Sequence, residues 1–365
     1  MKVIISRPQL LSLVSKVQNV VPSKPTLPIV ANVLIEAIDD QVIISATDLT
    51  VSMRASCEAE VQEEGAITLP AKRLFPLLRE LISPTVEIHT LSPESAVVNS
   101  GSSHFKILGM HKNEFPTFPD LAQSCSFNIA PASMKELLSR ACFAAAREEG
   151  RNVFNAVLMQ IANQTVTFIG TDGKRLAKIH STIDLPQNLT RSCIIPLKTV
   201  EEMVRMLDTK VEMQARVIVM PDKIALEMPS MTLISKLLSG EFPDVSKVIP
   251  EEKEHAIALH REELMALLRQ VSLFTADSSS SVRFCFFNSE LHIFATHGEV
   301  GEGTVNMPVN YSGEKLEIAF NPINFLDILR HIKDETVKFN ITNPYHPGLI
   351  TDSSTAQFVI MPMRL

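Results

Sequence analysis

The chain has 365 residues, of which 45% are hydrophobic and 21% charged, as expected for a packed globular protein long enough for two to three domains. Tryptophan is absent and tyrosine occurs twice, so aromatic platforms for single-stranded nucleic acid are not expected. The net charge of -7 argues against a nucleic-acid binder of the usual basic kind, but it leaves open a protein whose basic residues gather on one face.

The N-terminal stretch and the cysteines bear on compartment and metal binding. The opening MKVIISRPQLL is too short an apolar run for a signal peptide, and no apolar stretch reaches the length of a membrane span. The cysteines are scattered and form no CxxC pair, which is typical of free thiols in a reducing cytoplasm and not of a zinc site. We therefore expect a cytoplasmic protein with no membrane partner, no metal and no other cofactor.

Apolar residues at helical spacing predict six helices along the chain. The predicted ranges are 7–21, 71–81, 131–146, 197–207, 261–274 and 322–332. Their starts lie about 60–65 residues apart, and strand-like stretches with turn signals run between them. Each half-repeat is therefore expected to hold one helix plus about four strands.

A longer repeat of about 125 residues groups these halves in pairs. Alternating strand segments end in a small residue and a threonine, at Thr47, Thr171 and Thr296. A proline near each following helix start recurs at the same spacing, at Pro70, Pro196 and Pro322. The repeat predicts an α+β protein of three similar domains, 1–121, 127–248 and 255–365.

A basic residue recurs at nearly the same place in every predicted helix. These residues are Lys16, Arg79, Arg140, Arg205, Arg269 and Arg330. The helix macrodipole alone favours Lys or Arg near a C-terminus, so any one of them has an ordinary explanation. Their common register favours a shared basic face, although acidic residues on the same helices make that face mixed.

Motifs for catalysis are missing from the sequence. In GTDGKR, Phe168 and Arg175 stand where a phosphate-binding P-loop needs glycine and Ser or Thr. No Gly-x-Ser-x-Gly occurs, and the histidines have no nucleophile or carboxylate at a catalytic spacing. We expect no enzymatic activity.

Six segments in order carry a resemblance to a known family. They are SKPTLPIVANVLIEA from Ser23, ATDLTVSMRA from Ala46, TLPAKRLFPLLREL from Thr68, GTDGKRLA from Gly170, SKLLSGEFPDVSKVIP from Ser235 and VIMPMRL at the end. Over its whole length the chain resembles the bacterial DNA polymerase III beta subunit, the family of DNA sliding clamps.

The resemblance implies the DNA clamp fold, with three similar domains per subunit forming half of a six-domain ring whose helices line the hole. It implies a homodimer that encircles duplex DNA without sequence preference and confers processivity on the exonuclease-containing polymerase complex, without catalysing a reaction itself. Matching positions imply that DNA phosphates are met by Lys24, Arg79, Arg140, Arg147, Lys198 and Arg205.

Two departures from the family pattern affect this DNA-binding set. Lys24 stands where the family often has Arg, which keeps the charge and loses the bidentate fork. Glu148 and Glu149 follow Arg147 where relatives carry neutral polar residues, and this is expected to weaken the DNA contact of that loop.

The resemblance also implies a pocket for short apolar peptides of the DNA polymerase III alpha subunit, the clamp loader and other proteins with a clamp-binding motif. The matching residues are Phe154, Thr171, Gly173, Lys174, Arg175, Leu176, Pro243, Lys247, Val248, Val359, Met361, Pro362 and Met363. Arg175 and Lys247 are expected to meet acidic or carbonyl groups of the peptide. Phe154 is larger than the usual aliphatic residue, so the peptide preference is expected to differ.

The C-terminal FVIMPMRL has an ordinary explanation as a last core strand, which we favour for Val359 alone. A strand interior rejects Pro362, so the residues from Met361 to Met363 are better explained by the pocket.

Subunit contact is expected, by the same resemblance, from the edge strand holding Phe105 and Ile107 and from the segment at Leu273 and Phe274. An ordinary edge strand, protected from aggregation by Lys106, is the alternative. A protein-interaction scaffold that does not encircle DNA would share the repeat, the terminal pocket and the acidic charge, and it remains the alternative function.

Overall fold

The structure of the chain, a computed structural model, describes residues 1–121, 125–148, 153–185, 190–207, 213–251, 256–275 and 281–364. Glu149 lies outside the described residues, so the expectation for that position stays a prediction. Within these ranges no helix is long and apolar enough to cross a membrane.

All six predicted helices are confirmed, and each begins at the predicted residue. They are α1 Arg7–Val17, α2 Ala71–Glu80, α3 Pro131–Cys142, α4 Leu197–Met206, α5 Arg261–Ser272 and α6 Pro322–Arg330. Each ends before the predicted range does, and after α1, α3 and α5 the chain goes into a turn. After α1, for example, the Val20 amide donates to the Val17 carbonyl at 3.1 Å and the Val20 side chain is fully buried.

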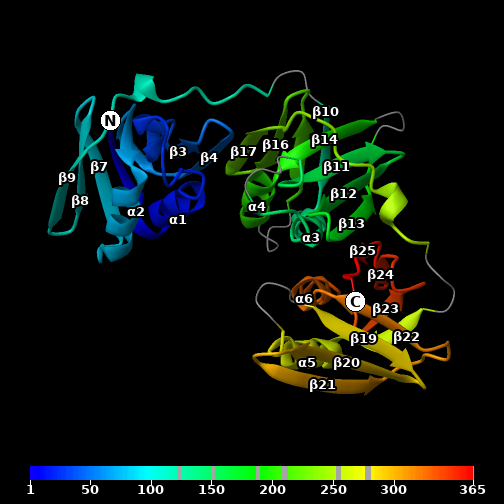
Figure 1. Ribbon diagram of the computed structural model, residues 1–365. Helices are drawn as coiled ribbons and strands as arrows, with labels where there is room; N and C mark the ends of the chain where they lie inside the picture. Colours follow the sequence, from blue (N-terminus) through cyan, green and yellow to red (C-terminus); the bar gives the residue numbers. More distant parts are fainter. Residues whose placement is uncertain are drawn as a thin grey trace. The chain divides into compact units, whose positions relative to one another are not determined.

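One eight-stranded antiparallel sheet combines strands from the first and second sequence repeats. Its order is β10 (Cys125–Ile129), β15 (Ala215–Val219), β16 (Lys223–Met228), β17 (Met231–Lys236), β4 (Val51–Glu58), β3 (Gln41–Thr47), β2 (Asn32–Ile38) and β6 (Gly65–Pro70). The two halves meet where β17 pairs with β4, and Figure 1 shows β3, β4, β17 and β16 in sequence.

A second eight-stranded sheet joins the second and third repeats in the same way. Its order is β14 (Arg191–Pro196), β11 (Ala156–Ala162), β12 (Thr165–Thr171), β13 (Arg175–Thr182), β25 (Gln357–Ile360), β24 (Gly348–Thr351), β23 (Thr336–Asn340) and β18 (Ile257–His260). Here the halves meet where β13 pairs with β25.

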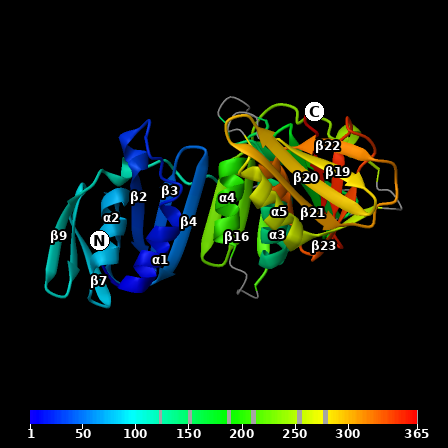
Figure 2. The same ribbon diagram turned by 60° about the horizontal axis from the view of Figure 1, so that its bottom comes forward.

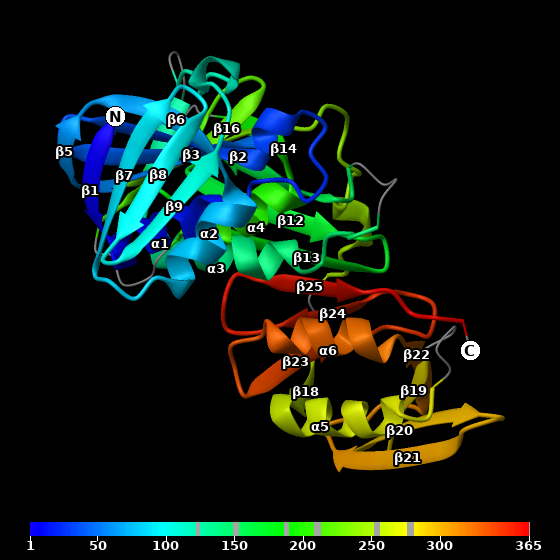
Figure 3. The same ribbon diagram turned by 90° about the vertical axis from the view of Figure 1, so that its left-hand side faces the viewer.

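Two further sheets are each a single half. One has the order β5 (Glu60–Glu63), β1 (Lys2–Ser6), β7 (Thr85–Ser92), β8 (Ser95–Ser100) and β9 (Ser103–Leu108). The other has the order β21 (Gly301–Pro308), β20 (Glu290–His297), β19 (Val282–Phe287) and β22 (Leu316–Phe320). Strand β9 ends the first of these sheets (Figure 2) and β21 ends the second (Figure 3).

The compact units of the chain follow the sheets and not the sequence repeats. One unit is Met1–Lys135 with Lys198–Leu237, and the other is Glu136–Leu197 with Leu238–Leu365. Each therefore holds one eight-stranded sheet and one half-sheet. A repeat cannot complete its sheet alone, so the chain passes between units inside the second repeat.

Helices pack on both the eight-stranded sheets and the half-sheets and supply the core with apolar side chains. In the first unit α1 packs beside α2, and in the second α5 packs beside α6 (Figure 3). Helix α5 buries Leu264, Leu268 and Val271 at helical spacing, as its apolar pattern predicts. Five of the six recurring basic residues lie on helix faces that stay exposed, and Arg140 is buried.

Candidate functional site

An apolar cluster lies in the second compact unit where the second repeat meets the third. Strands β11–β14, β24 and β25 supply its buried residues, which are Ala156, Leu158, Ile169, Leu176, Ile194, Leu349 and Val359. Half-buried side chains pack over them, namely Val153, Leu238, Phe242, Val245 and Ile249. We call this set the groove cluster, after the peptide pocket that the sequence predicts here. It includes Leu176 and Val359, two of the residues predicted for the peptide pocket, which are direct cross-strand partners in the β13·β25 pairing.

A rigid turn between β12 and β13 borders the groove cluster. The Asp172 carboxylate accepts from the Lys174 amide at 2.8 Å and from the Arg175 amide at 2.9 Å. The Thr171 hydroxyl donates to the Arg175 carbonyl at 2.7 Å and accepts from the Gly173 amide at 3.1 Å. Gly173 has a φ of 84°, a conformation in which glycine pays no steric penalty. Four predicted pocket residues thus lie in one fixed turn that leads into Leu176, namely Thr171, Gly173, Lys174 and Arg175.

Arg175 is held by two carboxylates and is not free to meet a peptide. Its guanidinium lies 3.3 Å from Asp172 and 2.6 Å from Asp327, and it stands over the Phe143 ring at 5.5 Å. Only 12% of the side chain is exposed. The expected contact of Arg175 with acidic groups of a peptide is therefore corrected to a structural role. Lys247 is 84% exposed, with its ammonium 3.9 Å from Asp244.

The C-terminal segment divides at Ile360. Up to that residue β25 pairs with β13 on one side and β24 on the other, and its apolar side chains are buried. Beyond it the Met361 amide donates to the Lys174 carbonyl at 2.9 Å, and the Met361 side chain is 37% exposed. The Met363 amide donates to the Ala319 carbonyl at 2.8 Å. Val359 is thus a core strand residue, while Met361, Pro362 and Met363 run on beside it partly exposed.

The remaining predicted pocket residues lie on the segments that adjoin the cluster. Lys247 and Val248 belong to the short helix η3 (Ser246–Val248), between the cluster residues Val245 and Ile249, and Pro243 follows Phe242. Phe154 is half-buried and follows Val153. Several members of the groove cluster are missing from the predicted set, among them Leu158, Ile169, Ile194 and Phe242. The alternation of apolar and polar residues along their strands was the only sequence pattern that could have indicated these strand residues.

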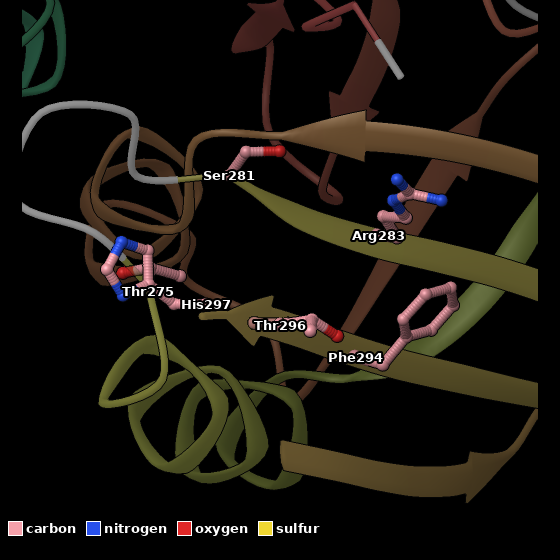
Figure 4. A pocket seen from close by; sticks show the side chains of 7 residues that line it. Thr275, Ser281, Arg283, Phe294, Thr296 and His297 are labelled. Atoms are coloured by element: carbon pink, nitrogen blue, oxygen red, sulfur yellow. The ribbon is translucent and has the colours of Figure 1, made fainter. Parts of the chain in front are cut away.

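The corresponding place in the third repeat is a polar cavity of about 410 Å³, shown in Figure 4. In the second repeat the groove floor contains the cross-strand pair Leu158 and Ile169, and the corresponding pair in the third repeat is Arg283 and Phe294. The Arg283 guanidinium lies 3.2 Å from Glu317 and 5.8 Å from the Phe294 ring centre. A charged, ion-paired side chain at this position does not suit an apolar peptide, whereas the apolar pair of the central repeat does.

Five of the six recurring helix basics are exposed, and Arg140 is the exception. Arg140 is 4% exposed, and its guanidinium donates to Asp352 at 2.5 Å and to Ser354 at 2.7 Å. It also lies 5.3 Å from the Phe358 ring centre. The predicted contact of Arg140 with DNA is wrong, because this side chain joins α3 to the third repeat inside the core.

The other predicted DNA contacts reach solvent. Arg79 and Arg205 are 65% and 53% exposed, and each pairs with a glutamate of its own helix. The Lys198 side chain is 42% exposed, and its ammonium contacts Asp48 and donates to the Val20 carbonyl. Lys24 and Arg147 are exposed loop residues. Arg79 can meet phosphate at the cost of an exposed ion pair with Glu80, which is worth little in water. Arg205 and Lys198 pair with carboxylates that are only 4% and 13% exposed, so they would bind phosphate while remaining beside those carboxylates.

The predicted interface residues lie on or beside the two single half-sheets. Phe105 is 39% exposed and Ile107 half-buried on the free edge β9. Leu273, directly after α5, is 73% exposed. Phe274 packs on β21, where a Cβ built on Gly303 would come within 2.6 Å of its ring.

Comparison with known proteins finds matches to one family along the whole chain. Models of the N-terminal, central and C-terminal domains of the DNA polymerase III beta subunit match residues 1–119, 128–244 and 246–364. The beta sliding clamp of Chlamydia pneumoniae is 49% identical over 365 residues, covering 100% of this chain and 99% of the relative. That of Escherichia coli K12 is 30% identical over 369 residues, with 100% of both covered. The solved DNA polymerase III subunit beta of Pseudomonas aeruginosa has a TM-score of 0.94 at 29% identity, again covering 100% of both chains.

The buried Arg140–Asp352 pair should make stability depend on pH. Burial acts to raise the pKa of Asp352, but hydrogen bonds from Ser354 and the Lys333 amide, with the charge of Arg140, outweigh it and hold that pKa below its ordinary 3.8. Because the folded-state pKa is depressed, the stabilisation is fully present above about pH 4 and is lost as pH falls through the lowered value.

Asp352→Asn should lower the free energy of unfolding by about 3 kcal/mol at pH 7, because the buried guanidinium loses its buried counter-charge and keeps only the half-exposed Glu136, 3.5 Å away. The difference from the parent chain should shrink below pH 4, as measured by urea unfolding. Glu80→Gln, which breaks the exposed pair with Arg79, should change stability by less than about 0.5 kcal/mol. Equal effects of the two substitutions would contradict the role given to Asp352.

Proposed function

The chain belongs to the DNA polymerase III beta subunit family, the beta sliding clamps, and from that premise we propose that two copies close into a ring around duplex DNA and hold a polymerase there. In this family role the chain is a processivity factor and does not catalyse a reaction. The proposed site of action is the cytoplasm, and the proposed domains are 1–121, 127–248 and 255–365.

The observation that carries this proposal is the arrangement of the sheets. Two repeat junctions are completed within the chain as eight-stranded sheets, and a half-sheet remains at each end of the repeat series. Half-sheets with free edges at β9 and β21 are what a second copy would complete. A head-to-tail pair of chains would then contain six junctions of one kind, which is a closed ring.

Retention by closure suits the charge of the protein. A net charge of -7 repels DNA at long range, so affinity alone would not hold the protein on a duplex. Exposed helix residues such as Arg79 and Arg205 supply contacts to phosphate, which carry no sequence information. A ring with such an inner face can slide along DNA without dissociating.

The groove cluster is the proposed docking site for partner peptides. Its floor is apolar, its border turn is fixed, and Met361 and Met363 are pliable side chains that suit several different ligands. The proposed partners are the DNA polymerase III alpha subunit, the clamp loader and other proteins that carry a short apolar clamp-binding motif. Since Arg175 is occupied by carboxylates, Lys247 is the proposed contact for acidic or carbonyl groups of the peptide. An interaction scaffold that does not encircle DNA would not account for a half-sheet with a free edge at each end of the repeat series, at β9 and at β21.

Deletion of residues 361–365 should abolish binding of a short apolar peptide from the polymerase, measured by fluorescence anisotropy. The melting temperature should change little, because the strand pairing and burial of β25 end at Ile360. Tyr345→Ala, at a side chain 86% exposed and outside the groove cluster, should leave the peptide affinity unchanged. A large fall in melting temperature on deletion would instead make these residues part of the core.

Arg205→Gln should lower the amount of protein loaded onto nicked circular DNA by roughly two- to fivefold, because one phosphate contact is lost. Arg216→Gln is the matched control, since both arginines are 53% exposed and both pair with a glutamate, but Arg216 lies on strand β15 and not on a helix. The effect should diminish at high salt. Equal loading of the two variants would remove Arg205 from the proposed DNA-contacting surface.

A further inference from the structure

We propose that Asp327 of α6 is a positioning residue for the peptide groove, because it holds Arg175 and so fixes the turn to which the C-terminal segment is bonded. The inference rests on the proposed peptide docking and adds to it a residue that lies outside the groove cluster. Asp327 would act through Arg175, without touching the bound peptide.

The Asp327 carboxylate is shared between two arginines. One oxygen accepts from the Arg330 guanidinium of the same helix at 2.6 Å, and the other accepts from the Arg175 guanidinium at 2.6 Å. The Arg330 side chain is 52% exposed, whereas that of Arg175 is 12% exposed. The bond to Arg175 is therefore the one shielded from water, where a charge-assisted hydrogen bond is strongest.

The Arg175 side chain depends on Asp327 for its hydrogen bonding. Within the described residues the Arg175 Nε has no hydrogen-bond partner, although the Asp172 carboxylate lies 3.3 Å from it as an ion-pair partner. Asp172 belongs to the same turn as Arg175, so this contact cannot tie the turn to another part of the fold. The bond to Asp327 is the one that joins the turn to a helix of the third repeat.

Two stacked rings support the same link. The Arg175 guanidinium lies 5.5 Å from the centre of the Phe143 ring, directly after α3. The His331 ring stacks on Phe143, with 3.9 Å between the ring centres and 8° between the planes. The His331 Nδ1 donates to the Asp327 backbone carbonyl at 2.7 Å. The guanidinium thus ends on a packed surface made by α3 and α6.

The backbone of the turn carries the link onward to the C-terminal segment. Arg175 pairs across strands with Ile360, the last residue of β25. The preceding carbonyl, that of Lys174, accepts from the Met361 amide at 2.9 Å. Helix α6 itself packs against β25 (Figure 3). Asp327 therefore anchors the same turn that holds the first residue of the partly exposed segment.

The first junction has the same backbone arrangement without this side-chain link. The Thr47 hydroxyl donates to the Val51 carbonyl at 3.0 Å, which makes Val51 the counterpart of Arg175. The Lys236 amide donates to the Thr50 carbonyl at 3.0 Å, which is the same bond between strand end and turn. The backbone bonds are thus common to both junctions, and the charged side chain is particular to the second.

The helix of the first junction carries an acid at the equivalent place. Glu202 is the sixth residue of α4, as Asp327 is of α6, and each pairs with the arginine three positions further on. Val51 offers Glu202 no opposite charge. Of the two junctions, only the one whose last strand leads into Met361 and Met363 has the link from helix to turn. This difference favours a role in peptide docking over a role that every junction needs.

Loss of the Asp327 carboxylate should loosen the turn and the C-terminal segment together. Arg175 would keep only its contact with Asp172, inside the turn. Met361 and Met363 would then occupy more positions in the free protein, and a bound peptide would have to order them. The expected result is weaker docking with an unchanged groove cluster.

Peptide affinity tests the proposal, with a synthetic peptide that carries the apolar clamp-binding segment of the polymerase. Asp327→Asn should raise its dissociation constant about three- to tenfold in fluorescence anisotropy with the full chain. Arg330→Gln is the matched control, because it removes the other partner of the same carboxylate, and it should stay within about twofold of the parent chain. Arg175→Gln should resemble Asp327→Asn. Because both break one link, the double variant should be at most about twofold weaker than either.

Amide hydrogen exchange separates positioning from general stability. Asp327→Asn should speed exchange at the amides of Met361 and Met363 and leave β24 and β25 unchanged. Asp352→Asn, which weakens the fold more, should speed exchange along β24 and β25. It should nevertheless leave the dissociation constant of the peptide within about twofold of the parent value, because Asp352 touches neither the turn nor the C-terminal segment.

The outcomes distinguish this inference from the proposed function. A parent chain that does not bind the peptide would overturn the groove itself. A parent chain that binds, with Asp327→Asn unchanged or Arg330→Gln equally weakened, would overturn the role of Asp327 alone. An equal loss of affinity in Asp352→Asn would assign the effect to the stability of the junction and would overturn that role as well.

Discussion

An unpaired strand edge is the constraint on which this structure depends. Backbone donors and acceptors at the edge of a sheet seek partners, and a half-repeat of one helix and about four strands has an edge that it cannot cover itself. Within the chain two such edges are paired, β4 with β17 and β13 with β25. Each junction joins strands of two different repeats, so a compact unit of the structure is not the same as a repeat of the sequence. The end halves retain free edges, and assembly follows from the same requirement.

The proposed peptide groove is a consequence of one of these junctions. Pairing of β13 with β25 sets Leu176 against Val359 and brings the last residues of the chain beside the turn that precedes Leu176. The buried pair of Arg140 and Asp352 joins α3 to the hairpin between β24 and β25, so it supports the same junction. Stability and partner binding are thus carried by neighbouring but separate residues, with core packing up to Ile360 and partly exposed methionines beyond it.

The sequence allowed much of this architecture to be predicted, because the helices and hairpins are encoded locally. Helical spacing located all six helix starts, and the recurring threonines and prolines located the repeated halves. Arg140 could not be placed in the same way, because its partner Asp352 lies 212 residues away and its helix pattern equals that of the exposed arginines. The register of the β20·β21 hairpin could not be predicted either. Ala295 pairs with Gly303, one residue further along the chain than the equivalent pairs Ala46 with Met53 and Gly170 with Ala177. Groove floor residues such as Ile169 were indistinguishable in the sequence from ordinary core strand residues.

Retention of the protein on circular and on cut DNA tests the central claim most directly. After loading by a clamp loader onto a nicked circular duplex, the protein is separated from free protein by gel filtration, and half of the sample is then linearised at one site. A closed ring that holds DNA by topology should co-elute with the circle in salt that screens phosphate contacts, and it should be lost after the single cut. Equal retention on both forms, or loss from both at the same salt concentration, would show that affinity and not closure holds the protein on DNA.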